Sequence, residues 1–290
     1  MAHSPSFPGA NGGPAPPGKS AWYARAMKWG KRALVLAASA IATYLGWCVI
    51  LLGVYAVVFP PVTGVQLQRR MEAITQPAAP QQSYEPIPLS RIDPDLPLAV
   101  VAGEDSRFFL HSGIDWTEVG NALQAYWQGD DLRGASSITQ QLVKNLFLTT
   151  HSTLLRKALE VPLTYAAELL LSKRRILELY VNVIEWGPGV FGIKAATQYH
   201  YGLPPQPLTK AQAAALAACI PAPLDRRPQT VGRYQRVIRD RMSVLDPLPI
   251  SRAPLENPPI APERAQSFAL ETDRPPGALT APLSFPPAPH

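Results

Sequence analysis

One stretch of the chain has no charged residue over 27 positions, and it restricts the fold more than any other feature. It runs from Ala33 to Phe59. As a helix it would be about 40 Å long, against a hydrocarbon core of roughly 30 Å in a bilayer. A secretory signal core is only about 7 to 15 residues long. The run therefore predicts a transmembrane helix over residues 33–59, which the proline pair after it would end.

Basic residues precede this run, and no acidic residue stands among them. They are Lys19, Arg25, Lys28, Lys31 and Arg32. Because cytoplasmic flanks are enriched in Lys and Arg, we expect the N-terminus in the cytoplasm. Everything after Pro60 would then lie outside, which in a Gram-negative cell is the periplasm. The sequence thus predicts a single-pass protein of the cell inner membrane with a periplasmic catalytic domain.

Proline divides the rest of the chain. The sequence has 33 prolines among 290 residues, and they gather towards both ends. Residues 1–32 are predicted to be a basic disordered cytoplasmic tail and residues 246–290 a proline-rich disordered tail. Residues 60–95 are predicted to be a membrane-proximal linker and the start of the domain, with extended character over 62–71. Residues 96–245 remain as the globular domain.

Charge and cysteine content restrict the function only loosely. A net charge of +6 and a pI of about 9.4 favour an acidic partner, and both nucleic acid and anionic lipid would suit. The two cysteines, Cys48 and Cys219, stand alone in apolar or alanine-rich stretches. Their spacing indicates neither a disulfide framework nor a metal site.

The globular domain has the period of helices. Helical spacing of apolar residues predicts helices over 114–128, 173–182, 195–201 and 210–220, and no strand pattern of any length stands between Leu96 and Met242. The fold class is therefore mainly α. A glycine-rich turn at 187–192 lacks the preceding strand that a dinucleotide-binding fold needs.

Two adjacent carboxylates, Glu104 and Asp105, follow an apolar run that should be buried. Burial raises the pKa of a carboxyl group towards the range useful for proton transfer, and Arg107 could keep the other carboxylate ionised. A charged helix end with a hydrogen-bonded His111 explains the same residues. Taken alone, the stretch leaves both interpretations open.

Two further groups of polar residues lie downstream. Ser137 and Gln140 fit a capping box, and Gln140, Gln141 and Lys144 share one side of the helix that follows. That side is either a solvated face or a site for a polyhydroxylated or anionic ligand. Arg156 and Lys157 are spaced to pair with Glu160, which by itself predicts only intrahelical salt bridges of about 0.2 to 0.5 kcal/mol.

Taken in order, these residues resemble the motifs of the peptidoglycan glycosyltransferases, the family shared with the N-terminal halves of bifunctional penicillin-binding proteins. The matching residues are Glu104, Asp105, Phe108, His111 and Gly113; then Gly134, Ser136, Ser137, Gln140, Gln141, Lys144 and Asn145; then Arg156, Lys157 and Glu160; then Arg175 to Asn182 with Tyr180, followed by Gly187 and Gly192. The sequence has no Ser-x-x-Lys or Lys-Thr-Gly motif of a transpeptidase, so it resembles the monofunctional form.

The resemblance implies a lysozyme-like helical domain that polymerises glycan strands. The growing strand would pass from undecaprenyl pyrophosphate to the 4-hydroxyl of lipid II, with inversion. Glu104 and Glu160 would be catalytic. Substrate binding would fall to Asp105, Phe108, His111, Gly113, Ser136, Ser137, Gln140, Gln141, Lys144, Asn145, Arg156, Lys157, Tyr180 and Asn182. A divalent cation, Mg²⁺ or Mn²⁺, is a candidate cofactor, and Glu160 is its candidate ligand.

The implied partners are lipid II, the nascent glycan strand and the membrane. Other cell-wall synthesis proteins are further candidates, and nucleic acid is not among them. The sequence departs from the family pattern at Ser137, at Tyr199 to Tyr201, at Gln212 and at Ala222.

Two rival functions remain. A lysozyme-like hydrolase or lytic transglycosylase would also be helical with a catalytic glutamate, but its sugar leaving group needs a protonated acid rather than cations. A membrane scaffold without activity would need none of these side chains for chemistry.

Overall fold

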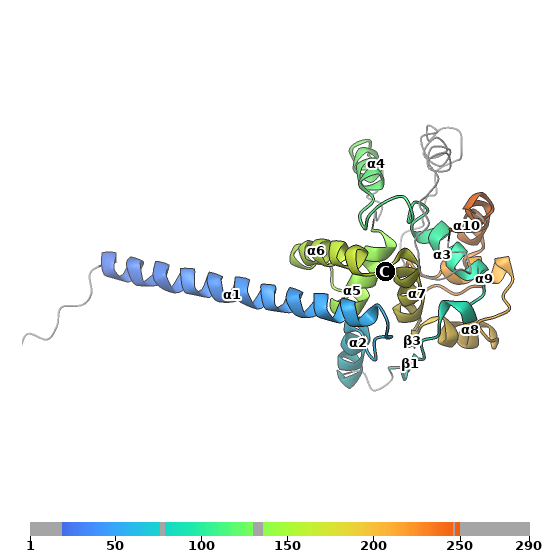
Figure 1. The fold of residues 1–290 in the computed structure, drawn as a ribbon, viewed down its shortest axis with the longest axis horizontal. Helices are drawn as coiled ribbons and strands as arrows, with labels where there is room; N and C mark the ends of the chain where they lie inside the picture. The colour runs from blue at the N-terminus through green and yellow to red at the C-terminus, as the bar shows by residue number, and fades with distance from the viewer. Residues whose placement is uncertain (1–18, 76–78, 130–135, 246, 250–290) are drawn as a thin grey trace, which may run out of the picture. The chain divides into compact units, whose positions relative to one another are not determined.

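The computed structural model describes residues 19–75, 79–129, 136–245 and 247–249 (Figure 1). The chain divides into two units, Met1–Cys48 and Val49–His290, and each is described by itself. Most of the two predicted disordered tails, residues 1–18 and 250–290, lies outside the described residues. Gly134 of the second motif lies outside them as well.

Helix α1 spans Lys19–Tyr55, and its stretch Ala26–Tyr55 is a candidate membrane span. It begins earlier than the predicted span because alanine, lysine and arginine favour helix through the basic flank. It also ends before the predicted Phe59. The residue before a proline is disfavoured in helix, so the turn preceding Pro60 and Pro61 is already irregular.

The core of the Val49–His290 unit is built around two helical layers. In the first, α3 (Asp95–Glu104) packs against α9 (Lys210–Ala217) and α10 (Gly232–Leu245). Leu96 to Ala102 are all buried, because neighbours cover α3 on every side. The alanines of α9 permit a close approach to α3. This burial fixes the C-terminal end of α3, where Glu104 lies.

The second layer carries the other motifs. Its helices are α5 (Ile138–Phe147), α6 (Leu154–Leu170) and α7 (Lys173–Val183), with α5 packed on both of the others. Each begins at a hydroxyl cap, Ser137, Thr153 and Ser172, as expected for residues whose side chain accepts a hydrogen bond from the first turn. Helix α4 (Trp116–Trp127) and helix α8 (Ile193–Tyr201) complete the unit.

The structure corrects the prediction that residues 62–71 are extended, because α2 spans Gly64–Thr75. The Thr63 hydroxyl accepts from the Gln66 N–H at 3.2 Å, and the Gln66 side chain accepts from the Thr63 N–H at 3.0 Å. This reciprocal cap starts a helix whose Gln, Leu, Arg, Met, Glu and Ala residues favour it. Helix α2 packs on α5, so the chain joins the folded unit before residue 96.

The expected absence of strands was also wrong. Short strands β1 (Ser83–Tyr84), β2 (Glu185–Gly187) and β3 (Val190–Phe191) form a sheet in the order β1-β3-β2. Strand β1 is parallel to β3, and β2 is antiparallel to it. Segments of two or three residues are too short to produce a sequence period. Their β2–β3 turn is the glycine-rich stretch at 187–192.

Asn182 and Gly192 join this sheet to α7. The fully buried Asn182 side chain accepts from the Ile87 N–H at 2.9 Å and donates to the Ile87 carbonyl at 2.8 Å. Gly192 has φ +79°, and a Cβ there would lie 2.6 Å from the Asn182 carbonyl oxygen. Only glycine fits this position. The motif residues at the end of α7 therefore organise the fold beneath the site.

Candidate active site

Glu104 is the last residue of α3, and a neutral amide holds it. The Gln141 side chain donates from Nε2 to Glu104 Oε2 at 2.7 Å. Burial raises the pKa of Glu104, while the Gln141 hydrogen bond and the charge of Lys144 oppose that rise. A partly buried carboxylate with a raised pKa is suited to accept a proton from a reacting hydroxyl.

Tyr180 sets the orientation of the Gln141 amide. Its hydroxyl donates to Gln141 Oε1 at 2.8 Å, so the NH₂ end of that amide faces the carboxylate. Tyr180 is fully buried, and burial raises its pKa well above the ordinary value. Its hydroxyl therefore stays protonated near neutral pH. Tyr180, predicted to bind substrate, is connected to Glu104 through Gln141.

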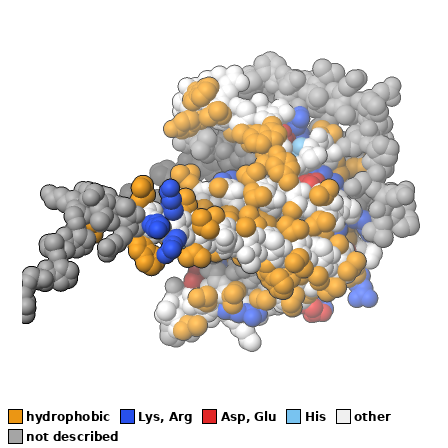
Figure 2. All heavy atoms as spheres, turned by 60° about the vertical axis from the view of Figure 1, so that its left-hand side comes forward, with side chains coloured by type: hydrophobic (Ala, Val, Ile, Leu, Met, Phe, Trp, Pro, Cys, Tyr) orange, Lys and Arg blue, Asp and Glu red, His pale blue; other side chains and the backbone are white. Residues whose placement is uncertain are grey.

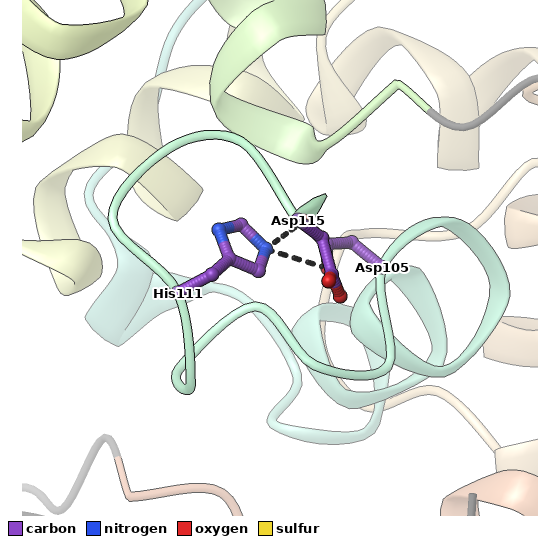
Figure 3. A group of neighbouring side chains, drawn as sticks. All are labelled: Asp105, His111 and Asp115. Atoms are coloured by element: carbon purple, nitrogen blue, oxygen red, sulfur yellow. Dashed lines mark hydrogen bonds and ion pairs between the residues drawn. The ribbon is translucent and has the colours of Figure 1, made fainter. Parts of the chain in front are cut away.

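The loop after Glu104 is held by a hydrogen-bonded chain (Figure 3). The Asp105 carboxylate accepts from His111 Nε2 at 3.0 and 3.1 Å and from the Ile138 N–H at 3.1 Å. His111 Nδ1 accepts from the Gly113 N–H at 3.2 Å. Gly113 has φ +97°, and a Cβ there would lie 2.6 Å from Thr164 Cγ2. Asp105, His111 and Gly113 thus fix the loop that follows the carboxylate.

Asp105, His111 and Asp115 have atoms close enough together to suggest a cation site. Their ligand atoms are already in use. His111 accepts at Nδ1, so its proton lies on Nε2 and points at Asp105. The two Asp115 oxygens accept from Arg107 Nε and from the Glu118 N–H, both at 3.0 Å. With a guanidinium beside it and a proton on the ring nitrogen, the group does not fit a metal ion.

Lys157, Arg156 and Glu160 form a second cluster, on α6. Glu160 is only 1% exposed, and its two oxygens accept from Arg156 Nη1 and from Lys157 Nζ, the latter at 2.7 Å. Lys157 also donates to the Ser136 hydroxyl at 2.9 Å. The predicted pairing of both cations with Glu160 is confirmed. Glu160 therefore orients two cations at the surface of the site.

The charges near Lys144 connect the two clusters. Burial lowers the pKa of Lys144, while the charges of Glu160 and Glu104 work in the opposite direction. Within the described part of the chain, Arg156 Nε is buried without a hydrogen-bond partner. An unpaired buried donor is costly unless a ligand supplies an acceptor. The cluster is therefore suited to an anion.

Glu160 was the candidate ligand for Mg²⁺ or Mn²⁺. Because both of its oxygens bond to cations, a divalent ion there would have to displace Arg156 and Lys157 and would lie beside their charges. The donor set of a magnesium site is oxygen-rich and anionic. The residues around Glu160 do not fit one.

Several other predicted binding residues serve the framework. The Phe108 ring is fully buried, with Lys173 Nζ 4.3 Å from its centroid. Ser137 and Gln140 close the predicted capping box, and the Ser137 hydroxyl also donates to the Gly113 carbonyl. These side chains lie beneath the reactive groups rather than among them.

Asn145 lies on the other side of Gln141. Its Nδ2 donates to the Gln141 carbonyl at 2.8 Å. Gln141, Lys144 and Asn145 together line one wall of a pocket of about 320 Å³. These three are the predicted binding residues on α5 that line this pocket.

The sequence analysis missed Arg69 and Glu185, which line the same pocket. They lie 116 positions apart, and Arg69 Nε donates to Glu185 Oε2 at 3.0 Å. One signal was available. Glu185 is an acidic residue between the apolar residues Val183, Ile184 and Trp186, where a charge needs a partner.

Comparisons with known proteins place the chain in a family. A family model described as Transglycosylase matches residues 70–248. A protein of Chromohalobacter salexigens is 43% identical over 199 residues, which cover 67% of this chain and 83% of that relative. A protein of Pseudomonas putida is 41% identical over 189 residues, 64% and 79% of the two chains. One of Pasteurella multocida is 42% identical over 166 residues, 56% and 68%. All three are named biosynthetic peptidoglycan transglycosylase.

Proposed function

The chain belongs to the transglycosylase family, and from this membership we propose that it polymerises the glycan strands of peptidoglycan. The growing strand, carried on undecaprenyl pyrophosphate, is transferred to the 4-hydroxyl of lipid II. One observation carries the proposal: Glu104, a carboxylate held by a neutral amide, lies near the cation Lys144, which in turn lies near Arg156 and Lys157. A base and an anion-binding cluster are what this transfer needs.

Glu104 acts as the general base. A sugar hydroxyl is a weak nucleophile, and it attacks faster when a carboxylate takes its proton in the transition state. The raised pKa of Glu104 makes it a stronger base than a solvated carboxylate. Gln141 holds one oxygen of Glu104 and so directs the other towards the reacting hydroxyl.

The cation cluster stabilises the leaving group. Pyrophosphate departs as an anion, so it needs positive charge and hydrogen-bond donors rather than a proton. Lys144, Arg156 and Lys157 provide them, with Glu160 fixing the two α6 side chains. Attack from the face opposite the pyrophosphate inverts the anomeric carbon and gives a β-linked product from an α-linked donor.

The surface of the protein supports a location at the membrane. Helix α1 supplies the anchor, and Lys28, Lys31 and Arg32 favour a cytoplasmic N-terminus. In the other unit, α6 exposes the side chains of Leu154, Leu155, Val161, Tyr165, Leu169 and Leu170. Figure 2 shows how widely hydrophobic side chains cover the visible described surface. We propose that the catalytic unit lies on the periplasmic side of the inner membrane, where lipid-linked substrates are tethered.

The test is polymerisation of lipid II by the full-length protein in detergent. We expect long glycan strands that lysozyme digests. If the protein instead shortened purified sacculi and made no polymer, it would be a hydrolase or lytic enzyme. Absence of both activities would indicate a scaffold.

The same assay with a chelator tests the cofactor. The cations around Glu160 already meet the charge of the pyrophosphate, and no step above needs a metal. We therefore expect polymerisation to persist when divalent ions are removed. Complete loss of polymer, restored by Mg²⁺ or Mn²⁺, would contradict this expectation.

A further inference from the structure

Helix α10 supplies no side chain to the site described above, yet it packs against α3, the helix that ends at Glu104 (Figure 1). Its Ile238 side chain is fully buried. A Cβ at Gly103, the residue before Glu104, would lie 3.1 Å from Ile238 Cδ1. A side chain there would crowd α10, because helices in a packed core leave no spare space. The glycine therefore lets α10 lie directly against the last turn of α3.

This contact provides hydrogen-bond donors for the end of α3. The last carbonyl groups of a helix have no partner within it, and together they carry a partial negative charge. Two of these groups bond to α10. The Tyr234 hydroxyl donates to the Gly103 carbonyl at 2.9 Å, and Arg241 Nη1 donates to the Ala102 carbonyl at 3.2 Å. Helix α10 thus caps α3 at the two residues before Glu104.

Neighbouring segments hold Tyr234 in place. The Arg226 guanidinium carbon lies 5.8 Å from the centroid of the Tyr234 ring, and Arg226 Nη1 donates to the Ala218 carbonyl at 3.0 Å. Ala218 is the C-cap of α9. On α10 itself, Gln235 Nε2 donates to the Ala211 carbonyl of α9 at 2.7 Å. The donors that cap α3 therefore belong to a frame made of α9, α10 and the segment between them.

The same frame acts on the charge of Glu104. Burial raises the pKa of Glu104, and the charge of Asp105 adds to the rise. The Gln141 hydrogen bond and the charges of Lys144 and Arg226 lower it. The ionisable groups that interact with Glu104 come from five parts of the fold: Asp105 after α3, Lys144 of α5, Tyr180 of α7, Arg226 after α9 and Tyr234 of α10.

We propose that Tyr234 and Arg241 are positioning residues for the proposed base. By bonding to the two carbonyl groups before Glu104, they fix the backbone from which its carboxylate projects, and so its direction towards the reacting hydroxyl. The inference rests on the proposed function, because it takes Glu104 as the base of glycan polymerisation. It gives a part in the reaction to α10, which follows the last of the matching motifs in the chain.

Tyr234→Phe keeps the ring and removes the hydroxyl, so the Gly103 carbonyl loses its partner. A base works only within hydrogen-bond reach of its proton, and small displacements are costly. We therefore expect kcat for lipid II to fall about tenfold, with KM changed less than about twofold. The unpaired carbonyl also adds negative potential beside Glu104, which raises its pKa. The acid limb of the pH profile of kcat/KM should then move to higher pH.

Arg241 is tested with two variants and a matched control. Arg241→Gln removes the positive charge at the end of α3, and we expect it to lower kcat and move the acid limb as Tyr234→Phe does. Arg241→Lys keeps the charge and a donor, so it should restore most of the rate. The control is Arg239→Gln, which removes the same charge from an exposed position on the same helix. It should leave kcat, KM and the acid limb unchanged.

Rates are measured on the full-length protein in detergent, well below the thermal midpoint of each variant. If the wild-type protein polymerises lipid II while Tyr234→Phe and Arg241→Gln keep its kcat and acid limb, the positioning role is refuted and the polymerase stands. A lower midpoint with kcat and the acid limb unchanged would show that α10 only stabilises the fold. Equal changes in Arg239→Gln would assign the effect to net charge and refute the role as well.

The outcomes also separate this inference from the proposed function. If the wild-type protein made no polymer, the proposed function would fail, and the positioning role would fail with it. If Tyr234→Phe did not fold, Arg241→Gln and Arg241→Lys would decide alone.

Discussion

Glu104 and Glu160 are the two carboxylates of the site, and their surroundings are opposite. Glu104 receives a hydrogen bond from the neutral Gln141 amide, and burial raises its pKa. Glu160 is almost fully buried, and Arg156 and Lys157 bond to its two oxygens. The first carboxylate keeps its affinity for a proton. The second has its charge neutralised by the two side chains that it orients.

Under the proposed function, this difference gives the two carboxylates different roles. A base needs an oxygen that is free to take a proton, and both Glu160 oxygens already accept hydrogen bonds from Arg156 and Lys157. A carboxylate that positions cations must stay ionised. Changing Glu104 should therefore alter activity alone, whereas changing Glu160 should alter activity and stability together.

The largest effect is expected for Glu104→Gln. The substitution removes the base, and general base catalysis contributes about 10²- to 10⁴-fold, so the rate of lipid II polymerisation should fall by that factor. Glutamine keeps an acceptor for Gln141, so the thermal midpoint should not fall. Rate and midpoint are measured on the same preparation. Polymerisation at the wild-type rate would mean that another group is the base.

Glu160→Gln should reduce both stability and activity. It leaves the Arg156 and Lys157 charges without their carboxylate. Removing one partner of a buried pair costs about 3 to 5 kcal/mol, but Lys157 is 45% exposed, so we expect about 2 kcal/mol. The rate should fall roughly tenfold, because the two cations lose their fixed positions.

Chemical denaturation and polymerisation assays measure these two effects. Glu85→Gln is the control, since it breaks the more exposed Lys194–Glu85 pair and should change neither property. If Glu160→Gln abolished activity with no loss of stability, Glu160 would take a direct part in the chemistry, and the contrast with Glu104 would need revision.

The pH profile of kcat/KM should be a narrow bell. Glu104 acts as a base only when ionised, and its raised pKa means that activity is lost at a higher pH than for a solvated glutamate. Lys144 binds an anion only when protonated, and its lowered pKa means that activity is lost on the alkaline side earlier than for a solvated lysine. Below the acid limb and above the alkaline limb, kcat/KM falls about tenfold per pH unit.

Lys144→Arg tests the assignment of the alkaline limb. Arginine keeps its charge at every accessible pH, so the limb should move to higher pH while the acid limb stays in place. If the alkaline limb were unchanged, a group other than Lys144 would be titrating.

Much of this site follows from the sequence, for physical reasons that differ by residue. The Ser137–Gln140 cap and the Arg156–Glu160 and Lys157–Glu160 pairs are local, so spacing alone predicts them. Helices α4, α7, α8 and α9 were predicted from their apolar period. Gly113 was predicted only through the family resemblance, and it must be glycine because its φ is +97° and because a Cβ there would meet Thr164 of α6.

Other features depend on contacts between distant segments. Tyr180 reaches Gln141 across 39 positions, and Arg69 reaches Glu185 across 116. No spacing rule encodes such pairs, because they arise only when helices pack. For the same reason the sequence could not tell that Phe108 and Asn182 are fully buried and belong to the framework. The three short strands were missed because their pairing, rather than their composition, defines them.

The smallest effect is expected for Tyr180→Phe, which tests how Glu104 is held. The phenylalanine ring fills the same buried space but cannot donate to Gln141 Oε1, so the Gln141 amide loses the group that sets its orientation. If the Gln141 amide flipped, its Oε1 rather than its Nε2 would face the Glu104 carboxylate. We expect kcat to fall about fivefold, the value of one neutral hydrogen bond of about 1 kcal/mol. The acid limb of the pH profile should also move up, because the Gln141 hydrogen bond lowers the pKa of Glu104.

Tyr201→Phe is the matched control for this prediction. It removes a partly buried hydroxyl, one that donates to the Gln212 carbonyl at 3.0 Å. It should leave kcat and the acid limb unchanged at a similar cost in stability. A loss of rate in Tyr180→Phe with no movement of the acid limb would show that Tyr180 only supports packing. Glu104 would then keep its basicity through burial alone, and its contrast with Glu160 would rest on solvation rather than on the orientation of an amide.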